Sequence, residues 1–122
     1  MKNPKKLILT AVMSAGLVAG GVAAGAPAAN AATSCPTNYL CLYSGTNQTG
    51  TMLFMGNGSS MNNSGGYFQS SYLAGGSAVR SSVNNTLGRF CTYSASLVKT
   101  NILAAQTGGN LASTNVRYVK IC

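Results

Sequence analysis

The chain has 122 residues and a formal net charge of +8, and it contains no aspartate, glutamate or histidine. General acid–base catalysis, Ser-His-Asp or Cys-His nucleophiles and paired-carboxylate glycoside hydrolysis all depend on side chains that are missing here. We therefore expect no enzyme and no cofactor. The oxygen ligands that hard cations prefer are largely missing too, so the composition also predicts no metal site.

The N-terminal segment has the order of a secretory signal peptide. Met1–Lys6 carries three lysines, Leu7–Ala24 is small and apolar, and Ala29-Asn30-Ala31 is an A-x-A cleavage site. A membrane anchor is the alternative, but several glycines lower the hydrophobicity of the run and no second apolar span follows. We expect residues 1–31 to be a signal peptide and residues 32–122 to be a single secreted, extracellular domain without a membrane anchor.

The first strand of that domain is predicted at Tyr39–Tyr43, an apolar run that follows Cys35. Tyr43 and Gly50 have an aromatic-x6-glycine spacing, which suits a β-hairpin whose turn folds back beneath the ring. In such a hairpin the glycine supplies either a positive φ or room for the ring to pack on bare backbone.

The rest of the chain also predicts strands. Thr51–Met55 has strand length, and the Ser-, Asn- and Gly-rich stretch up to Gly76 reads as a long loop held by scattered aromatics. A turn is expected at Gly108-Gly109, and no segment of residues 32–122 has convincing helical periodicity, so the domain is predicted to be all-β. The remaining strands are expected at residues 78–83, 88–93, 101–105, 110–112 and 116–122.

Four cysteines in a secreted domain indicate two disulfide bonds, for which the sequence permits three pairings. Zinc is the competing use, but the spacings include no C-x2-C pair and the chain lacks histidine. Cys41-Leu-Tyr-Ser recurs as Cys91-Thr-Tyr-Ser, and each copy begins a segment that ends in a Val-Arg strand, which suggests two related four-stranded units. If Cys91 opens the second unit and Cys122 closes it, Cys35 pairs with Cys41. This is the pairing we favour.

Five cations remain after removal of the signal peptide, with no acidic side chain to offset them. Such a surface favours anionic partners, including acidic protein faces and anionic cell-wall polymers, although the charge also serves solubility. The cations are scattered and lack a nucleic-acid-binding motif, so no nucleic acid is expected as a partner. They are Arg80, Arg89, Lys99, Arg117 and Lys120.

The stretch Cys35-Pro36 … Tyr39-Leu40-Cys41-Leu42-Tyr43 … Gly50 resembles the opening of secreted proteins of peptidase inhibitor family I36, which includes a Streptomyces metalloproteinase inhibitor. The resemblance continues through three further segments and covers nearly all of residues 32–122. The segments are Ser70-Ser71-Tyr72, Ser81-Ser82-Val83-Asn84-Asn85-Thr86 and Cys91-Thr92-Tyr93.

The resemblance implies a fold: a βγ-crystallin-like Greek-key sandwich of two four-stranded motifs. Tyr43, Gly50, Ser81, Ser82 and Tyr93 would be its signature residues. The positions before Ser81-Ser82 carry no carboxylate, so the calcium site of such folds is not expected here. Tyr93-x6 arrives at Thr100 rather than at glycine, so the second hairpin is expected to differ from the first.

The resemblance also implies a function, the inhibition of an extracellular protease, and of a metalloprotease in particular. A rigid, disulfide-tied monomer would present a loop to the protease cleft. The candidate surfaces are residues 55–76 and the segment around Cys91, and the sequence does not choose between them. A secreted antimicrobial or killer-toxin-like protein and a cell-surface structural protein without a target are the alternatives, and a fold alone does not decide among them.

Overall fold

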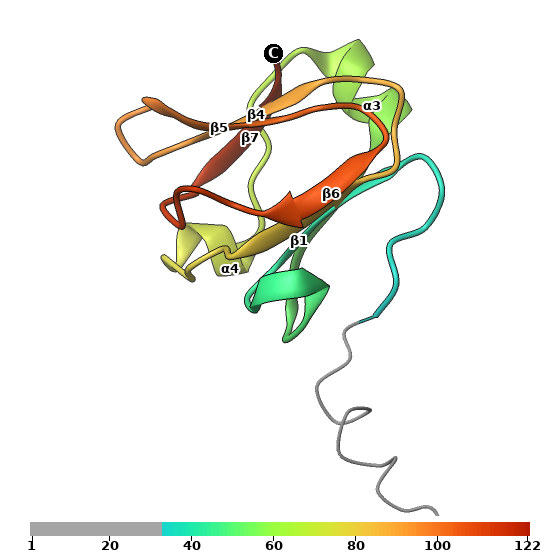
Figure 1. The fold of residues 1–122 in the computed structure, drawn as a ribbon. Coiled ribbons are helices and arrows are strands. Elements are labelled where there is room, and N and C mark those ends of the chain that lie inside the picture. Colours follow the sequence, from blue (N-terminus) through green and yellow to red (C-terminus); the bar gives the residue numbers. More distant parts are fainter. Residues whose placement is uncertain (1–32) are drawn as a thin grey trace, which may run out of the picture. The chain divides into compact units, whose positions relative to one another are not determined.

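The computed structural model describes residues 33–122, and the predicted signal peptide lies outside these residues. The regular secondary structure of the described residues is mostly β, as predicted, and it forms two antiparallel sheets (Figure 1), one of four strands and one of three rather than two of four. In chain order the elements are β1 (Tyr39–Tyr43), the 3-10 helix η1 (Thr46–Gln48), β2 (Met52–Asn57), α3 (Gly58–Ser64), α4 (Ser71–Ala74), β3 (Ser81–Asn84), β4 (Phe90–Tyr93), β5 (Lys99–Leu103), β6 (Thr107–Asn110) and β7 (Tyr118–Ile121).

The strand order shows that each half of the described domain, residues 33–122, contributes to both sheets. The first sheet has the order β2-β1-β3-β6, so its last strand comes from the second half of the chain. The second sheet has the order β5-β4-β7, and Phe68 from the first half pairs with Val119 at its edge. The Phe68 N–H donates to the Val119 carbonyl at 2.7 Å, and the Val119 N–H donates back at 2.9 Å.

The hydrophobic core draws side chains from both sheets, which therefore pack against each other. Leu40 and Leu42 enter it from β1, and Phe90, Leu103 and Val119 enter it from β4, β5 and β7. The alternate residues of β1 are buried as well, because the chain around Thr33 and Cys35 covers the other face of that strand. Burial on both faces explains why β1 reads as a continuous apolar run.

The first hairpins of the two halves of the domain match each other in register. Both hairpins have a register shift directly before a tyrosine, between Leu42 and Tyr43 in β1 and between Thr92 and Tyr93 in β4. The carbonyls of these tyrosines accept hydrogen bonds from the backbone N–H groups of Arg80 and Arg117, at 2.9 and 2.7 Å. The Val-Arg echo in the sequence thus corresponds to equivalent positions in the two sheets.

The stretch predicted as a long loop contains two short helices. The Asn57 side chain caps α3 by accepting from the Ser60 N–H at 3.1 Å, and Gly65 ends this helix with a φ of 65°. The Ser70 hydroxyl caps α4 by accepting from the Leu73 N–H at 3.2 Å. Helices of one or two turns are too short to show periodicity in the sequence, so their caps were the only available signal.

The turn predicted at Gly108-Gly109 was wrong, because both glycines lie in β6 and pair with Val83 and Ser82. A Cβ atom on Gly108 would lie 3.1 Å from the Ser82 carbonyl oxygen, so the lack of a side chain lets β6 approach β3 closely. The chain turns earlier instead, and Gln106 adopts a φ of 57° just before β6.

Both disulfide bonds join the cysteines that the sequence favoured. Cys35 is bonded to Cys41, which anchors the N-terminal segment on β1. Cys91 is bonded to Cys122, which ties β4 to the residue that follows β7. No free cysteine occurs among residues 33–122.

Candidate functional site

The connection from β3 to β4 exposes one large apolar side chain. Leu87 is 88% exposed, more than any other large hydrophobic residue in residues 33–122. Two residues that precede it, Asn84 and Thr86, are buried, with 0% and 1% exposed, whereas Asn85 and Gly88 are half-buried and Arg89 is exposed. We call residues 84–89 the Leu87 loop. A loop that presents an apolar side chain from a rigid scaffold is a candidate contact surface.

The Asn84 side chain holds both sides of the Leu87 loop. Its Oδ1 accepts from the Thr86 N–H at 3.0 Å and from the Thr86 hydroxyl at 2.7 Å, before Leu87. Its Nδ2 donates to the Gly88 carbonyl at 2.9 Å, after Leu87, and to the Leu103 carbonyl on β5 at 3.0 Å. Both N–H donors and the oxygen of this amide are therefore hydrogen bonded. The buried Asn84 side chain forms a bridge that links the backbone before Leu87 to the backbone after it.

Other parts of the fold hold the loop from outside. Gln106 Nε2 donates to the Thr86 carbonyl at 2.7 Å, and Asn85 Nδ2 donates to the Cys35 carbonyl at 2.8 Å. The Asn85 carbonyl accepts from the Asn38 N–H at 3.0 Å. Since the Cys35–Cys41 disulfide fixes the residue that Asn85 contacts, the covalent cross-link also supports the loop.

Gly88 lets the loop lie against α3. A Cβ atom at this position would lie 2.8 Å from the Asn62 side-chain oxygen and 3.2 Å from Ile121 Cδ1. The backbone after Leu87 thus packs closely on its neighbours, while the leucine side chain extends away from them. A loop that is held on both sides loses little conformational entropy when it binds.

A surface recess of about 650 Å³ lies beside Leu87. Its lining offers amide and hydroxyl groups but no acidic or basic side chain, which suits hydrogen bonding to a bound chain rather than proton transfer. The other lining residues are Thr37, Asn38, Ser59, Asn85 and Gln106.

The first of the two surfaces named as candidates from the sequence, residues 55–76, is mostly exposed and contributes Ser59 to the recess beside Leu87, although part of it is buried. Met61 and Leu73, from this first surface, are core residues of α3 and α4. Cys91, at the centre of the second, is 1% exposed and bonded to Cys122. The segment around Cys91 does begin directly after the Leu87 loop. The sequence signal that could have located the loop is a lone leucine between Asn-Asn-Thr and Gly, in a stretch that otherwise reads as a turn.

The expected signature residues lie in the hairpin of β1 and β2, in the neighbouring strand β3 and in β4. Tyr43 is buried, burial raises its pKa above the usual value, and its hydroxyl donates to the Thr33 carbonyl at 3.1 Å. Gly50 has a φ of 79° in the turn. The Ser81 hydroxyl donates to the Gly45 carbonyl at 2.6 Å and accepts from the Gln48 N–H at 2.9 Å. Ser82 and Tyr93 lie in β3 and β4.

Two further features bear on cofactors and membranes. Residues 33–122 contain no group of three or more potential metal-ligating His, Cys, Asp or Glu side chains. Within the same residues, no helix has the length and hydropathy needed to cross a bilayer. The two disulfide bonds are compatible with an extracellular protein.

Comparison with models of protein families matches residues 28–103 to peptidase inhibitor family I36. The chain belongs to this family, whose description indicates an inhibitor of peptidases rather than an enzyme. The matched range includes the whole Leu87 loop and ends at the last residue of β5. Searches of curated proteins and of solved structures found no match.

Proposed function

We propose that the protein is a secreted inhibitor that blocks an extracellular protease by placing the Leu87 loop in the protease cleft. The observation that carries this proposal is the 88% exposed Leu87 side chain on a loop that the buried Asn84 side chain holds by hydrogen bonds on both sides of the leucine. Membership of an inhibitor family supplies the class of partner, and the loop supplies the contact surface.

Leu87 would fill an apolar pocket of the protease. Burial of a leucine side chain contributes roughly 1.5–3 kcal/mol, and a preformed loop avoids much of the ordering cost that a flexible peptide would face. The amide and hydroxyl groups of the adjoining recess would form hydrogen bonds with groups at the rim of the protease cleft.

An apolar contact residue favours proteases with apolar specificity pockets. Trypsin-like enzymes select a basic residue with an aspartate at the base of the pocket, which Leu87 does not satisfy, although the exposed Arg89 of the same loop is basic. We therefore expect a metalloprotease as the target, in line with the metalloproteinase inhibitor resemblance, and subtilisin-like proteases as the next class to test.

The proposal also includes the fold, which would be a βγ-crystallin-like pair of Greek-key motifs. The supporting observations are the matched hairpins and the exchange of β6 and Phe68 between the two sheets. Residues 1–31 would be the signal peptide, and residues 32–122, which form a compact unit, would be the mature extracellular monomer.

The direct test is a titration of the oxidised protein, secreted from an expression host, against a thermolysin-like metalloprotease, a subtilisin and a trypsin. The proposal predicts stoichiometric inhibition of the metalloprotease and little effect on trypsin. Inhibition of subtilisin alone would keep the loop mechanism and change the target class. A folded protein that inhibits none of the three at micromolar concentration contradicts the proposal.

A further inference from the structure

The outer face of the second sheet carries a group of aromatic and basic side chains that the Leu87 loop does not use. Val119 and Thr92 are buried on the core side of β7 and β4. Because successive side chains of a strand point to opposite faces, the residues next to them point outward. These residues include Tyr93, Tyr118 and Lys120; Tyr67 packs on their side chains, and Lys99 pairs with Tyr93. We call the five residues the Tyr–Lys face.

Three tyrosines of this face pack edge to face. The Tyr67 ring centroid lies 5.3 Å from that of Tyr93, with an angle of 83° between the ring planes, and 5.9 Å from that of Tyr118, with an angle of 71°. Tyr67 is 44% exposed and directly precedes Phe68, which pairs with β7. The contact fixes the tyrosines while Tyr67 stays accessible.

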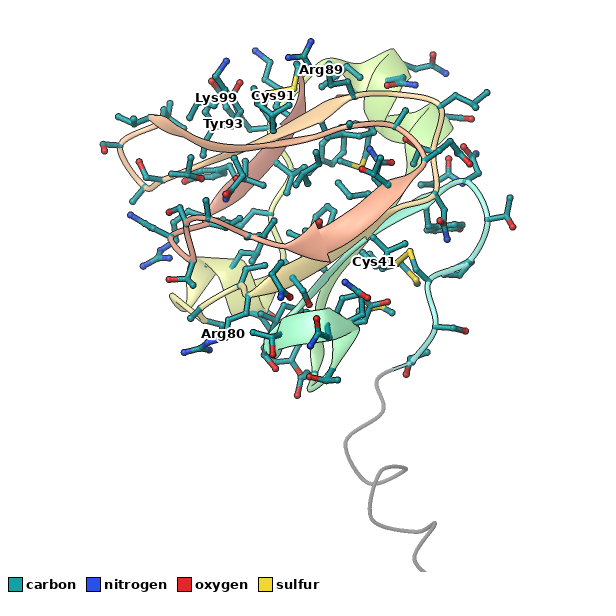
Figure 2. The ribbon with its side chains drawn as sticks, in the orientation of Figure 1. Cys41, Arg80, Arg89, Cys91, Tyr93 and Lys99 are labelled. Atoms are coloured by element: carbon teal, nitrogen blue, oxygen red, sulfur yellow. A yellow bond between two sulfur atoms is a disulfide. The ribbon has the colours of Figure 1, made fainter. Side chains whose placement is uncertain are left out.

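Two lysines flank the tyrosines. Lys120 Nζ lies 4.8 Å from the centroid of the Tyr67 ring, which holds the cation over the aromatic group. Lys99 on β5 is opposite Tyr93 and is exposed. Figure 2 shows Lys99 and Tyr93 together on the side of the domain that also carries Cys91 and Arg89, with Arg80 on the opposite side.

These cations have no acidic side chain to pair with, since the sequence contains no aspartate or glutamate. An anion from outside is therefore the complementary partner for this face. Tyrosines beside the charges add ring surfaces and hydroxyl groups that a simple solubilising charge does not need.

We propose that the Tyr–Lys face binds an anionic polysaccharide, such as a polymer of uronic acids. Sugar rings present C–H faces to the exposed part of the tyrosine rings, hydroxyl groups to the phenols, and carboxylates to Lys99 and Lys120. Two lysines are few for the dense phosphates of a nucleic acid, whose binding rests on many such contacts. Lysine rather than arginine at both positions also favours single-point contacts to spaced charges.

The Tyr–Lys face adjoins the Leu87 loop at one end. The loop enters β4 at Phe90 and Tyr93 lies at the other end of that strand, but Lys120 pairs with Cys91, next to Phe90. Binding to a polysaccharide through this face would concentrate the inhibitor on an anionic matrix.

The test measures binding of the oxidised protein to immobilised polygalacturonate, with neutral dextran and poly-glutamate as comparison polymers. We expect binding to polygalacturonate that weakens as salt rises, no binding to dextran, and weaker binding to poly-glutamate. Equal binding to poly-glutamate and polygalacturonate would overturn the proposal in favour of an acidic protein partner. Absence of binding to polygalacturonate would also overturn it.

Matched variants locate the surface. The double variant Lys99→Gln/Lys120→Gln is expected to weaken binding roughly five- to tenfold, whereas Arg80→Gln/Arg117→Gln removes the same charge and is expected to weaken it less than about twofold. Tyr67→Ala is expected to weaken binding, and Tyr72→Ala, which alters an exposed tyrosine on α4, is not. Equal losses in the two double variants would show that diffuse charge alone is responsible and would overturn the proposal. Melting curves confirm that each variant is folded.

Discussion

Gly50 and Leu97 occupy the same position in the two equivalent hairpins, and both have a left-handed backbone, with φ of 79° and 63°. Each precedes a residue that hydrogen-bonds the serine at the start of the turn: Thr51 bonds Ser44, and Val98 bonds Ser94. The second turn is three residues shorter, which is why the aromatic-x6-glycine spacing of the first has no counterpart after Tyr93.

The first prediction concerns this glycine. Gly50→Ala is expected to lower the free energy of unfolding by roughly 1–3 kcal/mol, because alanine is strained at positive φ and its Cβ would meet the Ser44 hydroxyl. Chemical denaturation measures the effect. Gly109→Ala is the control, since a Cβ at Gly109 meets nothing within 4 Å, and it should change stability by no more than about 0.5 kcal/mol. Equal effects would contradict the role given to Gly50.

The second prediction concerns pH. Residues 33–122 contain no Asp, Glu, His or free cysteine, which are the side chains whose ordinary pKa lies between about 4 and 9. Stability depends on pH only where the folded and unfolded states bind different numbers of protons. The free energy of unfolding should therefore be nearly flat over this range. A steep acid transition near pH 4 would contradict the prediction.

At alkaline pH, Tyr43 makes the free energy of unfolding depend on pH. Burial raises its pKa in the folded state, so the unfolded chain loses this proton first, near pH 10. The stability is present in full below that pH and falls as the pH rises through the folded-state pKa. Tyr43→Phe should flatten this alkaline decline and cost about 1 kcal/mol at neutral pH through loss of the bond to Thr33. Tyr72→Phe, at an exposed site, should leave the decline unchanged.

The third prediction concerns the buried bridge. Asn84→Ala leaves the Thr86 N–H and the Gly88 and Leu103 carbonyls without this partner, which should cost roughly 2–3 kcal/mol of stability. The loop would also lose its fixed shape, so protease inhibition should weaken by about tenfold.

Ser70→Ala is the matched control for Asn84→Ala. It removes the cap of α4 and the bond from the Ser70 hydroxyl to the Leu53 carbonyl, so it should lower stability by about 1 kcal/mol. Inhibition by the folded fraction should stay unchanged. If Ser70→Ala weakens inhibition as much as Asn84→Ala does, general stability rather than loop geometry controls binding.

The fourth prediction separates the two disulfides. Replacing Cys91 and Cys122 by alanine opens a separation of 31 residues and should cost about 3–4 kcal/mol, whereas replacing Cys35 and Cys41 opens one of 6 residues and should cost about 2 kcal/mol. Among the folded proteins, inhibition should weaken more when Cys35 and Cys41 are replaced than when Cys91 and Cys122 are replaced, because Cys35 contacts Asn85 in the Leu87 loop. The same order in both measurements would contradict the support that we assign to Cys35.

The parts of the fold that the sequence predicted well are those with local signals. β1 was predicted at its observed bounds because an apolar run lies between turns, and the pairing of Cys91 with Cys122 followed from the repeated Cys-x-Tyr-Ser motif. The helices after β2 were missed because they are short, and Gly108-Gly109 was misread because its pairing with β3 is a tertiary contact.

The candidate site could not be predicted from the sequence, for a related reason. Leu87 is distinguished by its exposure, and the contacts that hold its loop come from Asn38, Cys35, Leu103 and Gln106, which are distant in the chain. A local sequence pattern does not predict contacts between residues that are distant in the chain. The sequence analysis did not single out Leu87, and the lone leucine in a polar turn is the one local feature that could have done so.

The measurement that tests the central proposal most directly compares the inhibition constants of Leu87→Ala and Leu97→Ala against the protease that the unaltered protein inhibits best. Both variants shorten an exposed leucine in a turn, but Leu97 lies in the second hairpin. Loss of the leucine contact should weaken inhibition roughly 10- to 100-fold for Leu87→Ala and by less than about twofold for Leu97→Ala. Unchanged inhibition by Leu87→Ala would show that the protein contacts its protease through another surface.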